Sequence, residues 1–103
     1  MIKNNYSELV FDEWGFLKDF SKWTIDFANE ICISEGISFL NENHWKIINF
    51  LRDYFYKNDC CPRVKVVIER TGFSLREIYN LFPYGLVQSA FKIAGLPKPE
   101  ECN

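Results

Sequence analysis

The chain has 103 residues, which is enough for one domain and too few for two ordinary ones. Hydrophobic residues make up 48% of it and aromatic residues 17%, so it can bury a dense core and is not intrinsically disordered. The formal net charge of −2 predicts no strong attraction to nucleic acid or to anionic membranes.

The first predicted element is a short β-hairpin over residues 9–17, where apolar residues flank a turn supplied by Gly15. A helix is then expected from an N-cap at Ser21 to about Ser34. Its apolar residues share one helical face, which predicts that this face packs on the core; they are Trp23, Phe27, Ala28 and Ile31.

A second helix is predicted from about Glu42 to Lys57, after an N-cap at Asn41. Its apolar residues cover more than one stripe of the helix surface. We therefore expect this helix in the middle of the core. Asn58 and Asp59 are expected to end it.

Two shorter helices follow, over residues 62–70 and 74–82. Pro62 suits the first turn of one, and the capping box Ser74–Glu77 opens the other. Because a short turn that contains glycine joins them, they resemble a helix-turn-helix.

A last helix is predicted over residues 86–94, ended by Gly95. The sequence thus predicts a mostly α protein, a compact orthogonal bundle of about five helices. The predicted bundle carries an N-terminal hairpin and contains the helix-turn-helix-like pair.

Residues 96–103 are expected to form a flexible, extended C-terminal arm beside a helical domain of residues 1–95. Pro97 and Pro99 disfavour helix and favour polyproline II. Seven residue steps separate residue 95 from Cys102, and they span about 23 Å at ~3.3 Å per residue. A thiol at this tip can enter another protein's active site; the alternative is a frayed terminus with an incidental cysteine.

Neither a membrane span nor a secretion signal is predicted. No run approaches the roughly 18 apolar residues of a span, and the N-terminus lacks the apolar region of a signal peptide. We therefore expect a cytoplasmic protein whose four cysteines are free thiols. No Cys-x-x-Cys pair and no glycine-rich phosphate loop occur, so neither a metal nor a cofactor is expected.

Two motifs near the C-terminus are specific. Leu-Phe-Pro-Tyr-Gly occupies residues 81–85, and Lys-Ile-Ala-Gly-Leu-Pro-Lys-Pro occupies 92–99, followed after two residues by Cys102. This pattern resembles the DsrC/TusE family, small sulfur-trafficking proteins that include the gamma subunit of dissimilatory sulfite reductase. The likeness covers nearly the whole chain from Phe11 onwards.

The resemblance implies that Cys102 carries sulfur, as a persulfide or as an oxidised adduct. In the DsrC branch a second cysteine, eleven positions earlier, closes a disulfide or trisulfide with the first; Phe91 stands there in this chain. The resemblance therefore implies that this two-thiol cycle is unavailable and that the chain is nearer to TusE-like members. These relay sulfur on one cysteine, for example towards tRNA thiolation. A DsrC-like partner of dissimilatory sulfite reductase remains the alternative.

The surroundings of Cys102 are acidic, because Glu100 and Glu101 precede it and the terminal carboxylate follows. Like charge disfavours ionisation of the thiol, so we expect activation by a basic group on the domain or on a partner. The resemblance places Lys65 where family members commonly carry a basic residue near the docked arm; the alternative is an ordinary solvated lysine. His44 is expected to cap or pack a helix start rather than to catalyse.

The function we predict is that of a sulfur carrier, a sulfurtransferase-type carrier rather than a stand-alone catalyst. Its expected partners are sulfur-donor and sulfur-acceptor proteins. The alternative of another class is a DNA-binding regulator, whose reading helix begins at Ser74 with one basic residue, Arg76, near its N-terminus. Six basic residues against two acidic ones between Pro62 and Pro99 permit only a few contacts to a phosphate backbone.

Overall fold

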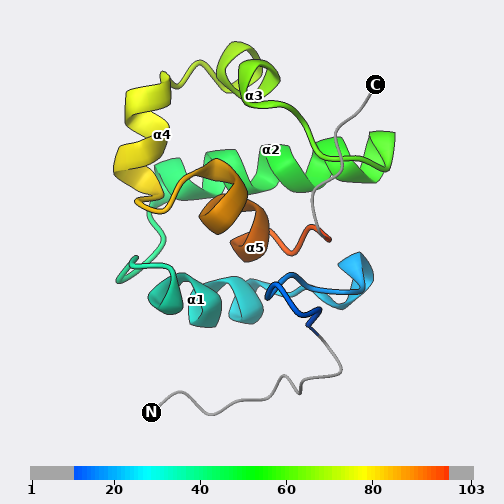
Figure 1. Cartoon of the computed structure of the whole chain (residues 1–103). Helices are drawn as coiled ribbons and strands as arrows, with labels where there is room; N and C mark the ends of the chain where they lie inside the picture. Colours follow the sequence, from blue (N-terminus) through cyan, green and yellow to red (C-terminus); the bar gives the residue numbers. More distant parts are fainter. Residues whose placement is uncertain (1–10, 98–103) are drawn as a thin grey trace.

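The computed structural model describes residues 11–97, which contain five α-helices. The helices are α1 (Ile25–Ser34), α2 (Glu42–Asn58), α3 (Val64–Thr71), α4 (Leu75–Leu81) and α5 (Phe91–Ile93). A 3₁₀ turn, η1 (Phe20–Lys22), precedes α1, and a π-helical segment, η2 (Leu86–Ala90), leads directly into α5. Helix α2 crosses the middle of the molecule, with α5 between it and α1 and with α3 on its other side (Figure 1). The helical part of the predicted bundle is therefore confirmed.

The predicted N-terminal hairpin is wrong. Its first two residues lie outside the described part of the chain, and the described residues contain no β-strand. Phe11 and Leu17 form an isolated antiparallel bridge instead. The carboxylate of Asp12 accepts hydrogen bonds from the amides of Trp14 and Phe16, both at 2.9 Å, and so closes a local turn. Phe16 and Leu17 are both buried, although alternate residues of a strand face opposite sides.

Helix α1 begins later than expected, because Thr24 and not Ser21 is its N-cap. The Thr24 hydroxyl accepts a hydrogen bond from the Phe27 amide at 3.0 Å. Ser21 lies in η1, where the Asp19 carboxylate accepts hydrogen bonds from its amide and its hydroxyl. Trp23, between Ser21 and Thr24, has an extended backbone with φ −67° and ψ 143°, so it cannot belong to a helix.

Helix α2 begins at the predicted cap, Asn41, whose side chain accepts hydrogen bonds from the amides of Asn43 and His44. In return, Nδ1 of His44 accepts a hydrogen bond from the Asn41 amide at 3.0 Å. The ring proton is therefore assigned to Nε2, which donates to the carbonyl of Leu81 at 2.7 Å. The ring also meets Phe82 edge-on, with centroids 5.2 Å apart. The expected capping and packing role of His44 is confirmed.

Helices α3 and α4 are the predicted pair, joined by residues 72–74. Helix α3 begins after Pro62 rather than with it, and Gly72, at φ 82°, ends it. The capping box of α4 is present: the Ser74 hydroxyl accepts from the Glu77 amide, and the Glu77 carboxylate accepts from the Ser74 amide. No helix in the described part of the chain is long and apolar enough to cross a membrane.

The last predicted helix consists of two segments of different helix type. Its first part, η2, is π-helical, buries Leu86, Ser89 and Ala90, and leaves Val87 exposed. Its second part, α5, packs against both α1 and α2. This position makes the end of the described chain part of the core rather than a surface appendage.

Helix α5 ends at a glycine in a tightly enclosed position. Gly95 has a φ of 74°, and the amide of Leu96 donates to the carbonyl of Phe91 at 3.0 Å, which is the pattern of a Schellman cap. A Cβ atom at position 95 would lie 2.4 Å from Cδ1 of Trp23. The Trp23 indole also donates from Nε1 to the carbonyl of Ile93 at 2.8 Å. The ring thus fixes the direction in which the chain leaves the core.

We predict a larger loss of stability for Gly95→Ala than for the control Gly72→Ala. Both glycines have positive φ, 74° and 82°, so each alanine costs about 1–2 kcal/mol of backbone strain. A Cβ at position 72 meets nothing within 4 Å, whereas one at position 95 meets Trp23. We expect Gly95→Ala to lose about 3 kcal/mol or more, because overpacking adds to the strain. Urea unfolding measures both variants, and equal losses would contradict the enclosure of Gly95.

We also predict that His44 makes stability depend on pH. Burial lowers the pKa of His44 from its ordinary value of 6.5, and the hydrogen bond to Leu81 opposes this shift. As the pH falls below that value, the unfolded chain takes up a proton that the folded state disfavours, so the free energy of unfolding decreases. His44→Gln retains a capping-box side chain and does not titrate. The wild-type urea midpoint should therefore fall more steeply between about pH 7 and about pH 5.5 than that of the variant; parallel slopes would contradict this role.

Candidate functional site

The predicted sulfur-carrying residue, Cys102, lies outside the described residues, as do Glu100 and Glu101. The structure instead describes the segment from which the C-terminus leaves the core. We call residues 93–97 the arm root. Leu96 is fully buried, and Pro97 is half-buried.

A partly buried arginine of α2 holds the arm root in place. Arg52 donates from Nη1 to the carbonyl of Ala94 at 2.8 Å and from Nη2 to the carbonyl of Phe20 at 3.3 Å. Its guanidinium carbon lies 3.9 Å from the ring centroid of Phe20 and 4.1 Å from that of Trp23. Burial lowers the pKa of Arg52 to about 10, so the guanidinium stays protonated at neutral pH. The positive charge faces the C-terminal end of α5, where the helix dipole favours cations.

Sequence reasoning gave Arg52 no role of its own. The available signal was a basic residue next to the apolar positions Ile48 and Leu51, both fully buried. A charge in that position needs a buried acceptor. Nothing in the sequence identified a carbonyl that lies 42 residues away along the chain as that acceptor.

The structure keeps Lys65 apart from the arm root. Lys65 is exposed in the first turn of α3, and in Figure 1 that helix lies on the opposite side of α2 from α5. Its role near the sulfur site therefore stays a prediction.

The cysteines of the domain have three different environments. Cys32 is 1% exposed, its thiol donates to the carbonyl of Asn29 at 3.3 Å, and burial raises its pKa. Cys61 is 2% exposed. Cys60 is half-buried and disulfide-bonded, which differs from the expectation of four free thiols. Phe91, at the position of the second cysteine in the DsrC branch, is 2% exposed within the core.

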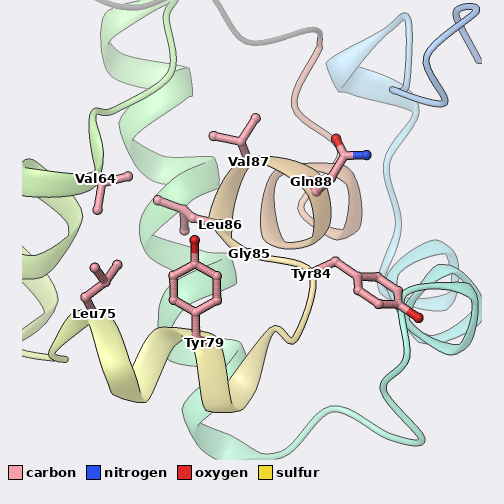
Figure 2. Close-up of a pocket in the computed structure, with 8 residues that line it drawn as sticks. All are labelled: Val64, Leu75, Tyr79, Tyr84, Gly85, Leu86, Val87 and Gln88. Atoms are coloured by element: carbon pink, nitrogen blue, oxygen red, sulfur yellow. The ribbon is translucent and has the colours of Figure 1, made fainter.

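Two surface pockets lie near these elements. One, of about 460 Å³, is lined by Trp23, Ile25, Asn29, Trp45 and Asn49. The other, of about 250 Å³, lies between α4 and η2 (Figure 2). There the ring of Tyr79 points towards Leu86, whereas the ring of Tyr84 points away, and a Cβ at Gly36 would lie 3.5 Å from it. Neither lining contains a thiol, a carboxylate or a histidine, so these pockets supply no group for sulfur chemistry. Within residues 11–97, no three histidine, cysteine or acidic side chains gather where they could hold a metal ion.

Comparisons with known proteins agree with the C-terminal motif. Residues 3–103 match the family model described as DsrC like protein. The chain is 47% identical over 91 residues to the gamma subunit of the dissimilatory-type sulfite reductase of Nitratidesulfovibrio vulgaris, covering 88% of this chain and 87% of that protein. It is 38% identical over 103 residues to the sulfurtransferase TusE of Escherichia coli K12, covering 92% and 93%.

Solved structures give the same result. The chain superposes on a chain of dissimilatory sulfite reductase I with a TM-score of 0.83 and 46% identity, covering 89% of this chain and 88% of that chain. The oxidized gamma subunit (DsrC) from Archaeoglobus fulgidus gives a TM-score of 0.78 and 40% identity over 90% of each chain. None of these names denotes a DNA-binding protein, so they lend no support to the helix-turn-helix alternative. The predicted resemblance is confirmed, and the chain belongs to the DsrC-like family.

Proposed function

We propose that this protein is a sulfur carrier that accepts sulfane sulfur on Cys102 as a persulfide and passes it to another protein. The observation that carries the proposal is the C-terminal motif of residues 92–99 with Cys102 behind it. The family supports it, because its named members include a sulfurtransferase and a sulfite reductase gamma subunit.

The chemistry requires one nucleophilic thiol. The Cys102 thiolate attacks the outer sulfur of a donor persulfide, a new sulfur–sulfur bond forms, and the donor cysteine leaves as a thiolate. Delivery repeats the exchange with an acceptor thiolate or another nucleophile. Neither step needs an acid or base from the domain, so we propose a sulfurtransferase-type carrier rather than a stand-alone catalyst.

The domain contributes a fixed starting point for the arm. Arg52 and Trp23 hold the carbonyls of residues 94 and 93, and Leu96 is buried. We propose that the arm, residues 96–103, is anchored at its first residue, Leu96, and that the helical domain, residues 1–95, stays outside the partner's active site. Lys65 is the residue we propose to offset the charges of Glu100 and Glu101 when the arm docks.

The partners we propose are a sulfur-donor protein and a sulfur-acceptor protein, as in a TusE-like relay. The second candidate is a DsrC-like partner of dissimilatory sulfite reductase, and one observation favours it. The chain is more similar to that gamma subunit, at 47% identity, than to the sulfurtransferase, at 38%. Phe91 favours the relay, because it occupies the position of the second cysteine. We propose a cytoplasmic location, where thiols are kept reduced.

We predict that Cys102 is the dominant site of sulfur loading. The reduced protein, incubated with a persulfide donor, should gain the mass of one sulfur atom on the C-terminal peptide. Cys102→Ser should abolish this gain, whereas Cys32→Ser should not, since Cys32 is buried with its thiol hydrogen-bonded. Peptide mapping by mass spectrometry locates the adduct. Sulfur found on the internal cysteines, with Cys102 unmodified, would contradict the carrier function.

We predict that the arm is dispensable for folding but required for sulfur acceptance. Residues 97–103 are prolines, charged residues, a cysteine and an asparagine, with little apolar area to bury. Their deletion should cost less than about 1 kcal/mol at ~25 cal/mol per Å² of apolar surface. Deleting Leu96 as well should cost about 1.5–3 kcal/mol more, because its side chain is fully buried. Thermal unfolding of both truncated chains measures this difference; collapse of the shorter deletion would contradict the proposed domain limits.

A further inference from the structure

We infer that the pocket between α4 and η2 is a docking surface for another protein. The occupant we infer is a segment of that protein which places one bulky apolar side chain in the pocket and carries carboxylates on either side of it. This inference concerns where a partner is held, and it does not depend on the thiol chemistry proposed above.

Apolar side chains of α3, α4 and η2 gather around this pocket (Figure 2). They are Val64 of α3, Leu75 and Tyr79 of α4, and Leu86 and Val87 of η2. Leu75, Tyr79 and Val87 are 47%, 52% and 45% exposed. Single exposed apolar side chains are common on protein surfaces, whereas a contiguous group of them marks an interaction site.

The size of the pocket suits one side chain. Its volume is about 250 Å³, which is below the range of about 300–1,000 Å³ that is typical of sites for small molecules. No charged residue lines it, so a charged small molecule would find no ion partner there. Bulky side chains that enter a pocket supply much of the binding energy of protein interfaces. The pocket therefore fits an aromatic or branched aliphatic side chain of a partner.

The backbone of η2 holds one wall of the pocket in place. The carbonyl of Gly85 accepts hydrogen bonds from the amides of both Ser89, at 2.9 Å, and Ala90, at 3.4 Å. Leu86, Ser89 and Ala90 are buried below this wide turn, which leaves Val87 at the surface. Such π-helical turns occur frequently at functional sites. A pocket that is already formed also loses little conformational freedom when a partner binds.

The surface around the pocket is basic. Residues 63–90 carry four basic side chains against two acidic ones, namely Arg63, Lys65, Arg70 and Arg76 against Glu69 and Glu77. Arg76 is exposed, follows Leu75 and precedes Tyr79 by about one helical turn. Within residues 11–97 it forms no ion pair. The carboxylate of Glu77 accepts a hydrogen bond from the Ser74 amide at 2.8 Å. An acidic segment is therefore attracted to this surface.

Neither end of this chain has the composition of such a segment. Residues 98–103 contain no large apolar side chain. Residues 1–10 contain large apolar side chains, but one lysine balances their one glutamate. The composition thus favours another protein as the occupant.

The test uses the full chain, isotope-labelled for amide NMR and kept reduced, with the synthetic peptide acetyl-Ser-Asp-Glu-Leu-Phe-Glu-Asp-Ser-amide as the probe. One matched peptide has Asn and Gln in place of the acids, and another has Ala-Ala in place of Leu-Phe. We expect the acidic peptide to shift the amide resonances of Leu75, Tyr79 and Val87. It should bind about fivefold or more tightly than either matched peptide. Added salt should reduce its advantage over the neutral peptide.

Matched variants locate the binding site. Val87→Glu places a carboxylate in the pocket, and the control Ile25→Glu places one at an exposed apolar residue of the other pocket. Both positions lie in the first turn of a helical segment, where glutamate is favourable, and thermal unfolding checks that both variants fold. We expect Val87→Glu to weaken binding of the acidic peptide about tenfold or more, and Ile25→Glu to leave it unchanged. Arg76→Gln should also weaken it, whereas Lys46→Gln should not.

Loss of binding in Ile25→Glu but not in Val87→Glu would overturn the inference, as would the absence of shifts at the three named residues. Equal affinity for the acidic and neutral peptides would overturn the acidic character of the partner. Shifts at the same residues that grow with protein concentration, without peptide, would assign the surface to a second copy of this chain instead. Cys102→Ser should bind the peptide as the wild type does, so a failure of the carrier function would leave this inference standing.

Discussion

The guanidinium of Arg52 connects three parts of the chain: α2, η1 and the end of α5. It is a charge with much of its surface removed from water, and two backbone carbonyls and the faces of two aromatic rings replace that water. One carbonyl belongs to η1 and the other to the end of α5, so a single side chain of α2 joins the beginning and the end of the described chain. Trp23 belongs to the same arrangement, since its indole stacks on the guanidinium and binds the carbonyl of Ile93.

The contacts of Arg52 and Trp23 explain where α1 begins and why a glycine follows α5. Trp23 is extended because its ring must lie against Gly95 and Arg52, and α1 consequently begins at the next available cap, Thr24. Gly95 lacks a side chain because the indole occupies the space where one would be. The arm root is therefore held from several sides, and on the proposed function this limits the region in which Cys102 can act.

The cysteines that the structure describes differ in burial and in bonding. Cys32 and Cys61 are small buried residues of the kind that fill a core. Phe91 fills the core at the position where the DsrC branch has its second cysteine, so no thiol is presented there. Cys60, at the end of α2, is the one described cysteine in a disulfide.

The sequence by itself determined the features that depend on near neighbours. The caps at Asn41 and Ser74 and the stop at Asp59 follow from side chains and backbone within a few residues, and the structure has all three. The family was predictable for a different reason, because the motif that ends in Cys102 is specific as a string of residues. The central position of α2 followed from apolar residues on more than one of its faces.

Only the tertiary structure decided the features that depend on distant residues. Residues 12–15 have the composition of a hairpin turn, and Asp12 closes a turn there. A pair of strands also needs side chains that alternate between two faces, and the neighbours Phe16 and Leu17 are both buried. The choice between Ser21 and Thr24 as the cap of α1 depended on Trp23 reaching the end of α5. The role of Arg52 is likewise long-range, because its two acceptor carbonyls lie 42 and 32 residues away along the chain. Local sequence specifies the caps and stops that near neighbours make, whereas the contacts that position a working group form only when the chain has folded.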